Sequence, residues 1–272
     1  METVAVLING RREQRIEVFD RGFQYGDGLF ETLLIDDRQI LFWNEHIERL
    51  EAGCRRLGIP APDGSLLYRE ALELCFGADE SVLKIILTRG PGGRGYLSPA
   101  PVRPTRVLSL HPLPAQIEKR RQEGVRVCLC RTPLGINPCL AGVKHCNRLE
   151  QILARSEWSD PEIYEGLMCD SEGWLVEGTM TNLFWVKEGH LLTPRVDRCG
   201  VAGIVRAWVL RTMHAWRIAT SEVRMRPSEL REAGEVFLTN SVIGIVPVIG
   251  CPSLDCTWPV GDLTRRLQGE WK

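Results

Sequence analysis

Residues 140–158, LAGVKHCNRLEQILARSEW, place a lysine, a histidine and a cysteine side by side at the start of a helix-like pattern. A zinc site would use His145 and Cys146, but adjacent residues rarely aim at one ion, and no second Cys/His pair lies nearby at ligand spacing. A nucleophilic cysteine is equally weak, because catalytic Cys and His normally meet through the fold. We therefore expect no metal and interpret both residues as structural.

Lys144 is the third member of this triplet and the best candidate for chemistry. Most lysines are solvated and do nothing chemical. The preceding residues NPCLAGV are small or apolar, so the amine can emerge in a low-polarity pocket where its neutral, nucleophilic form is accessible. A lysine that forms a Schiff base requires such surroundings.

If its aldehyde partner is pyridoxal 5′-phosphate, the chain must also supply a carboxylate for the pyridine nitrogen and an anion site for the phosphate. Glu177 lies between two apolar runs in WLVEGTMTNLFW, where pairing with a cationic ring explains a buried carboxylate; an edge-strand surface residue is the alternative. Gly200 and Gly203 precede a helical pattern whose first amides can bind a dianion. Arg49 can add donors, with a solvated helix arginine as the alternative.

The elements that must position these residues mix strands and helices without strict β-α-β alternation, which favours two α+β domains. We expect a hairpin at Asn9-Gly10, a helix capped by Asn44 and another helix after Asp63. The stretch GPGGRGYLSPAPVRP has too much Gly and Pro for regular structure, and a loop of that length often binds something.

The Pro-bearing segment HPLPAQ is the best candidate for a domain boundary. It divides the chain into a smaller N-terminal domain (1–112), a linker (113–118) and a larger C-terminal domain (119–272). In the second half we expect helices near Cys146, near Gly203 and at the C-terminus. The predicted strands there are VRVCLC, GLMCD, WLVEG, NLFWV, EVFLTN and VIGIVPVI.

Composition narrows the class of partner. With 34 basic and 35 acidic residues among 272, the net charge of -1 argues against a nucleic-acid backbone or an anionic membrane and favours a small-molecule ligand. The start of the chain has no signal-peptide pattern, and no stretch approaches the length that spans a bilayer, so we expect a cytoplasmic protein. The ten cysteines are scattered without Cys-x-x-Cys spacing, which predicts reduced thiols.

Taken in order, seven motifs resemble the fold-type IV pyridoxal-phosphate enzymes, the family of D-amino-acid and branched-chain aminotransferases and 4-amino-4-deoxychorismate lyase. They are DRGFQYGDGLFET, NEHIERL, LTRGPGGRGY, AGVKHCNRLEQILA, DSEGWLVEGTMTNLFW, TPRVDRCGVAGIVR and EVFLTNSVIGIVPV. The resemblance covers nearly the whole chain. It implies two α/β domains with the cofactor in the interdomain cleft, and homodimers that complete each other's sites.

Carried over by position, the resemblance implies that Lys144 is the Schiff-base lysine, Glu177 the pyridine-nitrogen carboxylate and Arg49 the phosphate arginine. Backbone groups of Ile204 and Val205 complete the implied phosphate site, with Asn240 and Ser241 near it. The candidate partners for substrate carboxylates are Arg94, Arg89 and Asn240.

Within this family, the stretches GGRGY, NRLEQ and TNSVIGIVPV resemble a lyase rather than an aminotransferase, and Phe30 stands where D-amino-acid aminotransferases carry a tyrosine. The implied activity is a carbon-oxygen lyase that converts 4-amino-4-deoxychorismate to 4-aminobenzoate and pyruvate on the route to folate. Two alternatives stay open: a D-amino-acid or branched-chain aminotransferase, and a protein that binds pyridoxal phosphate without turnover.

Overall fold

The computed structural model describes residues 5–271, which divide into two compact units. The first unit runs up to Pro114 and also includes Val143–Asn147, while the second comprises Ala115–Gly142 and the residues from Arg148 onward. The sequence places Val143–Asn147 in the C-terminal domain. The contacts of this segment assign it to the first unit instead, because its backbone pairs with a strand of that unit.

The first unit is built on a five-stranded antiparallel sheet in the order β1-β5-β4-β2-β3. Its strands are β1 (Ala5–Ile8), β2 (Gly28–Asp36), β3 (Gln39–Ile40), β4 (Ser81–Thr88) and β5 (Thr105–His111). Alternate apolar residues of β2 and β4, such as Leu33 and Leu83, are fully buried in one core. That period of two is what a sheet with one covered face requires.

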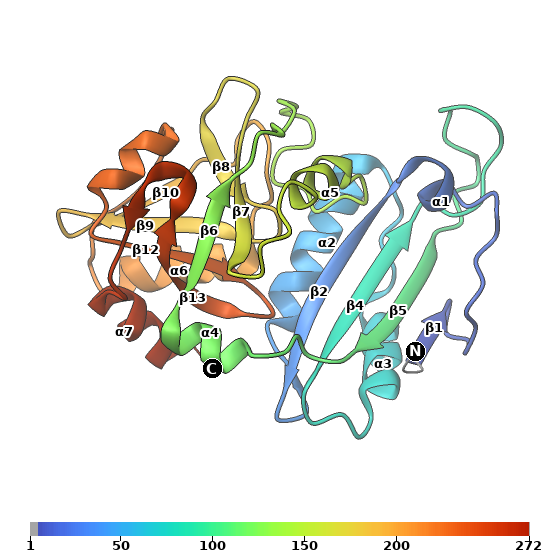
Figure 1. Ribbon diagram of the computed structural model, residues 1–272. Helices are drawn as coiled ribbons and strands as arrows, with labels where there is room; N and C mark the ends of the chain where they lie inside the picture. Colours follow the sequence, from blue (N-terminus) through green and yellow to red (C-terminus); the bar gives the residue numbers. More distant parts are fainter. Residues whose placement is uncertain (1–4, 272) are drawn as a thin grey trace. The chain divides into compact units, whose positions relative to one another are not determined.

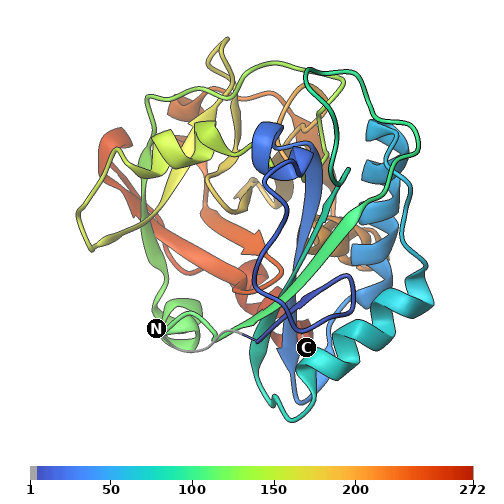
Figure 2. The same ribbon diagram turned by 90° about the vertical axis from the view of Figure 1, so that its right-hand side faces the viewer.

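Two long helices cover one face of this sheet, α2 (Trp43–Leu57) and α3 (Gly64–Cys75), as Figure 1 and Figure 2 show. The helix predicted after Asp63 is confirmed as α3, and Asp63 caps it, since its Oδ1 accepts from the backbone N–H of Leu66 at 2.9 Å. The predicted cap of α2 was wrong. Phe42 is the N-cap, with left-handed backbone, and Asn44 lies inside the first turn.

The N-terminal hairpin forms only in part. Asn9 and Gly10 make the expected turn with positive φ, and Ile8 pairs with Arg11. The polar residues 12–15 do not continue as a strand. They are exposed and bring no apolar face to bury, and β1 pairs instead with β5. A short helix, α1 (Arg21–Tyr25), then precedes β2.

The second unit contains a mixed nine-stranded sheet in the order β11-β10-β9-β12-β13-β6-β7-β8, with β14 paired to β13. The six strands predicted for this half are confirmed as β6 (Val125–Leu129), β7 (Ile163–Cys169), β8 (Leu175–Gly178), β9 (Asn182–Lys187), β12 (Glu235–Asn240) and β13 (Gly244–Cys251). The sequence did not predict β10 (His190–Pro194), β11 (Thr220–Val223) or β14 (Cys256–Thr257).

Apolar residues line both faces of this sheet. Phe184 of β9 and Phe237 of β12 stack at 5.0 Å in a cluster that includes Val205, whereas Leu183 and Trp185 belong to the opposite cluster. The helices of the unit are α4 (Ile117–Glu123), α5 (Leu149–Arg155), α6 (Ile204–Ala215) and α7 (Asp262–Glu270), with 3-10 turns η1 (Pro227–Glu232) and η2 (Pro252–Leu254). Within residues 5–271 no helix is long and apolar enough to cross a bilayer.

Candidate active site

Lys144 precedes a helix that begins later than predicted, since α5 starts at Leu149 rather than near Cys146. The lysine lies instead in an extended segment that pairs with β2. The N–H of Phe30 donates to the carbonyl of Lys144 at 3.0 Å, and the N–H of Cys146 donates to the carbonyl of Gly28 at 2.9 Å. Leu29 and His145 form the bridge between these bonds.

This antiparallel pairing determines what the amine contacts. Lys144 lies opposite Phe30, and residues opposite each other in such a pair project from the same face. The Nζ atom is 4.3 Å from the centroid of the Phe30 ring. Val143, one residue earlier, is buried in the core of the first unit. The amine therefore rests against an aromatic face that carries no hydroxyl, in keeping with the apolar surroundings predicted for it.

Arg49 is held by a buried acidic residue that the sequence analysis did not identify. Glu31 of β2 accepts from Nε of Arg49 at 2.8 Å and from Nη2 at 2.5 Å, and Nδ1 of His46 lies 2.7 Å from the same carboxylate. Burial alone would raise the pKa of Glu31, but the charge and hydrogen bonds of Arg49, with help from His46, lower it to about 2. The Arg49 guanidinium is therefore paired with a buried carboxylate and is not a solvated helix arginine. That it binds the phosphate of the cofactor stays a prediction.

Arg89 is the one predicted substrate residue that the structure contradicts. Its guanidinium grips Asp27 through Nε and Nη2 at 2.7 and 3.0 Å, and it also donates to the carbonyls of Leu57 and Gly58 at 2.8 Å. Its side chain is almost entirely buried. Because its donors serve these internal acceptors, we remove Arg89 from the list of substrate residues.

The loop that carries Arg94 is anchored by a second buried arginine. Arg21 donates to Asp27 at 2.9 Å and to the carbonyls of Gly95 and Tyr96 at 2.9 and 3.1 Å. Burial would raise the pKa of Asp27, and the bonds from Arg89 and Arg21 outweigh that effect and lower it. Arg94 itself is exposed on this loop, so its side chain is accessible to a ligand.

In the second unit, Glu177 is 4 % exposed on β8, which excludes the reading as an edge-strand surface residue. Its Oε2 accepts from the backbone N–H of Val201 at 2.8 Å and from Nδ2 of Asn182 at 3.4 Å. The amide of Asn182 also donates to the carbonyl of Val201 at 2.9 Å. These bonds tie the carboxylate to the loop that leads into α6.

Two glycines in that loop permit this close approach. Gly200 has a φ of +83°, and a Cβ there would lie 2.8 Å from Cγ1 of Val176 and 3.2 Å from Oε2 of Glu177. A Cβ at Gly203 would lie 2.0 Å from Oδ1 of Asn182. Any larger residue would push the loop away from the carboxylate.

Ile204 and Val205 are the first two residues of α6, after Gly203 as its N-cap. The helix has no side-chain cap and no acidic residue in its first turn. The amides of a first turn have no acceptor within their own helix, and the helix dipole adds positive potential there. Twelve residues of helix thus present an N-terminus with the electrostatics that a phosphate group requires.

Asn240 ends β12 and has a mainly local role. Its Oδ1 accepts from the N–H groups of Val242 and Ile243 at 2.9 and 2.8 Å, and its Nδ2 donates to the carbonyl of Met180 at 3.2 Å. Ser241 is half-buried in the turn so formed. Asn240 therefore shapes this turn, and only its second Nδ2 hydrogen is left for a ligand.

The Met180 turn is held from its other side by Glu165 of β7, a second acidic residue that the sequence analysis missed. This fully buried carboxylate accepts from the N–H groups of Thr179 and Met180 at 3.1 Å each, and from the hydroxyl of Thr181 at 3.0 Å. Burial raises the pKa of Glu165. A lone acid inside an apolar strand pattern, IYEGLMC, was the available signal.

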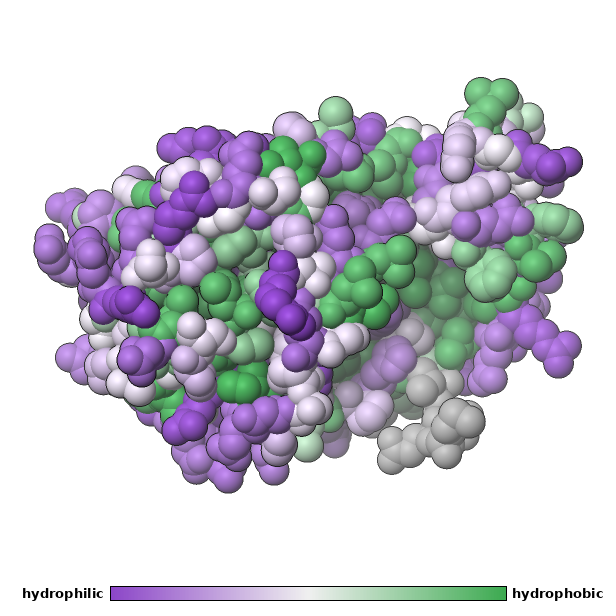
Figure 3. Space-filling model, turned by 45° about the horizontal axis from the view of Figure 1, so that its top comes forward, coloured by the Kyte–Doolittle hydropathy of each residue, from purple (hydrophilic) through white to green (hydrophobic). Residues whose placement is uncertain are grey.

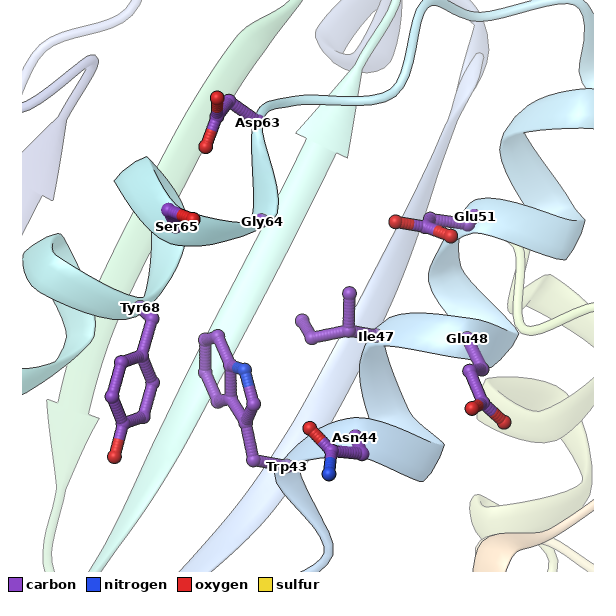
Figure 4. A pocket seen from close by; sticks show the side chains of 9 residues that line it. All are labelled: Trp43, Asn44, Ile47, Glu48, Glu51, Asp63, Gly64, Ser65 and Tyr68. Carbon is purple, nitrogen blue, oxygen red and sulfur yellow. The ribbon is translucent and has the colours of Figure 1, made fainter.

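A groove on the outer side of α2 and α3 contains none of the predicted site residues (Figure 4). Trp43 and Tyr68 pack there with ring centroids 5.0 Å apart. Glu48, Glu51 and Asp63 line it as well. Three carboxylates repel a phosphate group, so this groove is not the cofactor site.

Comparison with known proteins agrees with these features. The family model for amino-transferase class IV matches residues 28–251, and the chain belongs to that family. Among solved structures it is similar to 4-amino-4-deoxychorismate lyase from Pseudomonas aeruginosa, with 46 % identity, a TM-score of 0.92 and 97 % of each chain covered. It is 38 % identical to aminodeoxychorismate lyase from Vibrio harveyi, over 96 % of this chain and 97 % of that protein.

An aminotransferase is also among the relatives. The D-alanine aminotransferase of Bacillus licheniformis is 26 % identical over 97 % of this chain and 94 % of its own length. Family membership confirms the fold-type IV architecture and the dependence on pyridoxal phosphate expected from the sequence. The residues fit that cofactor, because the chain supplies a lysine, a buried carboxylate beside a glycine loop and an uncapped helix N-terminus.

Proposed function

We propose that this protein is an aminodeoxychorismate lyase, which converts 4-amino-4-deoxychorismate to 4-aminobenzoate and pyruvate with pyridoxal 5′-phosphate as cofactor. One observation carries the proposal: the relatives at 46 % and 38 % identity, matched over nearly their whole length, are both named for this lyase. The D-alanine aminotransferase is markedly more distant at 26 %.

Residues of the predicted site would hold the cofactor. Lys144 would bind its aldehyde carbon, Glu177 would face the pyridine nitrogen, and Arg49 with the amides of Ile204 and Val205 would bind its phosphate. The turn of Asn240 and Ser241 would lie near that phosphate. When bound, pyridoxal phosphate supplies an electron sink for a carbanion at the carbon that bears the amine.

The proposed role of Lys144 is to move a proton. Once the substrate amine has displaced it, Nζ would take the proton from the carbon that bears this amine. The bond between the adjacent carbon and the enolpyruvyl oxygen then breaks, and the ring becomes aromatic. Nζ would return the proton to the departing enolpyruvate, which leaves as pyruvate, so no keto acid enters the reaction.

The substrate also has carboxylates to be bound. Arg94 is exposed on its loop, and a guanidinium can bind a carboxylate through two parallel hydrogen bonds. The second Nδ2 hydrogen of Asn240 is a weaker partner. We propose Arg94 as the main one.

We further propose that the protein is a homodimer. Apolar side chains of the first unit are exposed along residues 16–23 and on the loop that carries Tyr96 and Leu97, both 87 % exposed. The two segments are joined, since the N–H of Gly92 donates to the carbonyl of Phe19 at 3.1 Å. Figure 3 shows hydrophobic residues at the surface, between hydrophilic ones. A second copy that covers them would remove this area from water.

The direct test is product formation. Protein loaded with pyridoxal phosphate, given 4-amino-4-deoxychorismate, should release 4-aminobenzoate and pyruvate in equal amounts, with both quantified by chromatography. The protein without cofactor should release neither above the background rate. A loaded sample that consumes no substrate would contradict the proposed function. The cytoplasmic location stays a prediction.

A further inference from the structure

Glu31 occupies a position where the fold by itself calls for an apolar residue. It lies on β2 between Leu29 and Leu33, which are 2 % and 0 % exposed, on the face of the sheet that packs against α2. Glu31 itself is 1 % exposed. A buried charge costs free energy unless it is fully paired, and an apolar residue of similar size often stabilises as well or better. Stability alone therefore does not explain this carboxylate.

Both oxygens of Glu31 are engaged by two residues from one face of α2. Arg49 grips the carboxylate through Nε and Nη2, and His46, one helical turn earlier, contacts Oε2 through Nδ1 at 2.7 Å. This side-on pairing fixes the plane of the guanidinium and directs its Nη1 edge away from Glu31. The orientation of Arg49 is set by Glu31.

His46 donates a hydrogen bond to Glu31 and adds no charge. It is 0 % exposed, and burial lowers its pKa more than the contact with Glu31 raises it. The ring is therefore neutral near pH 7, with the proton on Nδ1 donated to Glu31 and a lone pair on Nε2. Among residues 5–271, that Nε2 atom is buried with no hydrogen-bond partner. A neutral donor restrains the carboxylate while the pair of Glu31 and Arg49 keeps a net charge of zero.

We propose that Glu31, backed by His46, is a positioning residue that fixes the guanidinium of Arg49 for the phosphate group of the cofactor. The inference rests on the proposed function, in which Arg49 binds that phosphate. Since Glu31 cancels the charge of Arg49, its contribution is geometry and not attraction. It holds the arginine in one rotamer before the cofactor arrives, which lowers the entropy lost on binding.

The test compares two cofactors that differ only in the phosphate group, pyridoxal 5′-phosphate and pyridoxal. The Kd of each is measured by titrating cofactor-free protein and following the visible absorbance of the bound form. The Kd of pyridoxal divided by the Kd of pyridoxal 5′-phosphate reports how much the phosphate group contributes to binding. In Glu31→Gln this ratio should fall about tenfold or more, because an amide has one oxygen acceptor and cannot hold both Nε and Nη2 of Arg49 as the two carboxylate oxygens do, while the Kd of pyridoxal changes little.

Glu70→Gln is the matched control. Glu70 is also buried in the first unit and pairs side-on with Arg106 at 2.9 and 2.6 Å, but Arg106 is not part of the proposed site. This variant should lose thermal stability and keep the wild-type ratio. In a second comparison, Glu31→Gln added to Arg49→Lys should lower the ratio no further than Arg49→Lys alone, since both act through one guanidinium.

Three outcomes would overturn the inference while leaving the proposed cofactor site intact. The first is a wild-type ratio in Glu31→Gln, and the second is a double variant whose losses multiply. The third applies if Glu31→Gln does not fold. His46→Asn keeps the pair of Glu31 and Arg49 and should lower the ratio by a smaller factor, so an unchanged ratio in this variant would overturn the inference. A wild-type protein that binds pyridoxal as tightly as its phosphate would instead contradict the cofactor site itself, and the inference with it.

Discussion

At the scale of single residues, the surroundings of Lys144 separate it from the other lysines. Its amine lies 4.3 Å from the ring of Phe30, and the amine of Lys84 on β4 lies 5.5 Å from the same ring. Both amines therefore lie beside the same aromatic ring. Of the two, only Lys144 lies in the segment paired to the edge of β2, and we assign the proton transfer to it alone.

These two lysines allow a matched substitution. Lys144→Ala should abolish the visible absorbance of the bound cofactor and lower turnover by at least about a hundredfold, the usual contribution of a general base. Lys84→Ala removes the second amine beside the Phe30 ring. Because Lys84 has no assigned role in the reaction, this variant should change turnover by less than about threefold. Steady-state assays of both variants, loaded with cofactor, make the comparison. Equal losses in the two would remove Lys144 from its assigned role.

The sequence identified some site residues and missed others for one reason. Lys144 and Glu177 stand out locally, as a cation after small residues and an anion between apolar runs. Glu31 and Glu165 are also lone acids in apolar strands. Most of their partners, however, lie 14 to 18 residues away on other segments, so no local pattern shows how each carboxylate is satisfied.

At the scale of elements, the motif DRGFQYGDG is a network that holds a loop. Asp20 caps α1 by accepting from the N–H of Gly22 at 2.8 Å. The Asp27 carboxylate accepts hydrogen bonds from both Arg21 and Arg89. Arg21 then binds carbonyls at the tip of the loop. The buried charges of Arg21, Asp27 and Arg89 therefore stabilise residues 91–104, a segment that contains no helix or strand.

This loop provides the test of the proposed dimer. Replacing Tyr96 and Leu97 together by serine removes two exposed apolar side chains and should weaken dimer association by at least about tenfold, since apolar residues at the centre of an interface carry much of its free energy. Phe76→Ser is the control, because Phe76 is 93 % exposed in the same unit but lies at the end of α3. Sedimentation equilibrium measures both constants. A wild-type protein that stays monomeric at high concentration would contradict the dimer.

Strands were easier to predict than the starts of helices. Alternating residues identified β6, and short continuous apolar runs identified β9 and β12, whose residues are buried on both faces of the sheet. The starts of α2 and α5 were wrong, since Phe42 adopts a left-handed backbone and the residues around Lys144 form a strand pairing. Backbone conformation and distant pairing decided both cases, and neither is visible in a local window.

At the scale of the whole molecule, the site residues are divided between the two units. Lys144, Arg49 and Arg94 belong to the first, and Glu177, Ile204, Val205 and Asn240 to the second. The chain leaves the second unit at Gly142, whose N–H donates to the carbonyl of Gly200 at 2.9 Å, and reaches Lys144 two residues later. The sequence predicted two domains but did not predict that Val143–Asn147 belongs to the first unit, because that assignment depends on pairing with β2.

The division between lyase and aminotransferase is decided by what the enzyme needs to turn over repeatedly. An elimination leaves the amine on the product and regenerates the cofactor, whereas an aminotransferase leaves the amine on its cofactor until a keto acid removes it. The most direct measurement is the number of turnovers that a loaded sample completes on 4-amino-4-deoxychorismate with no keto acid present. We predict many turnovers per site, with 4-aminobenzoate and pyruvate in equal amounts. A reaction that stops after one turnover per cofactor and resumes only when a keto acid is added would contradict the account.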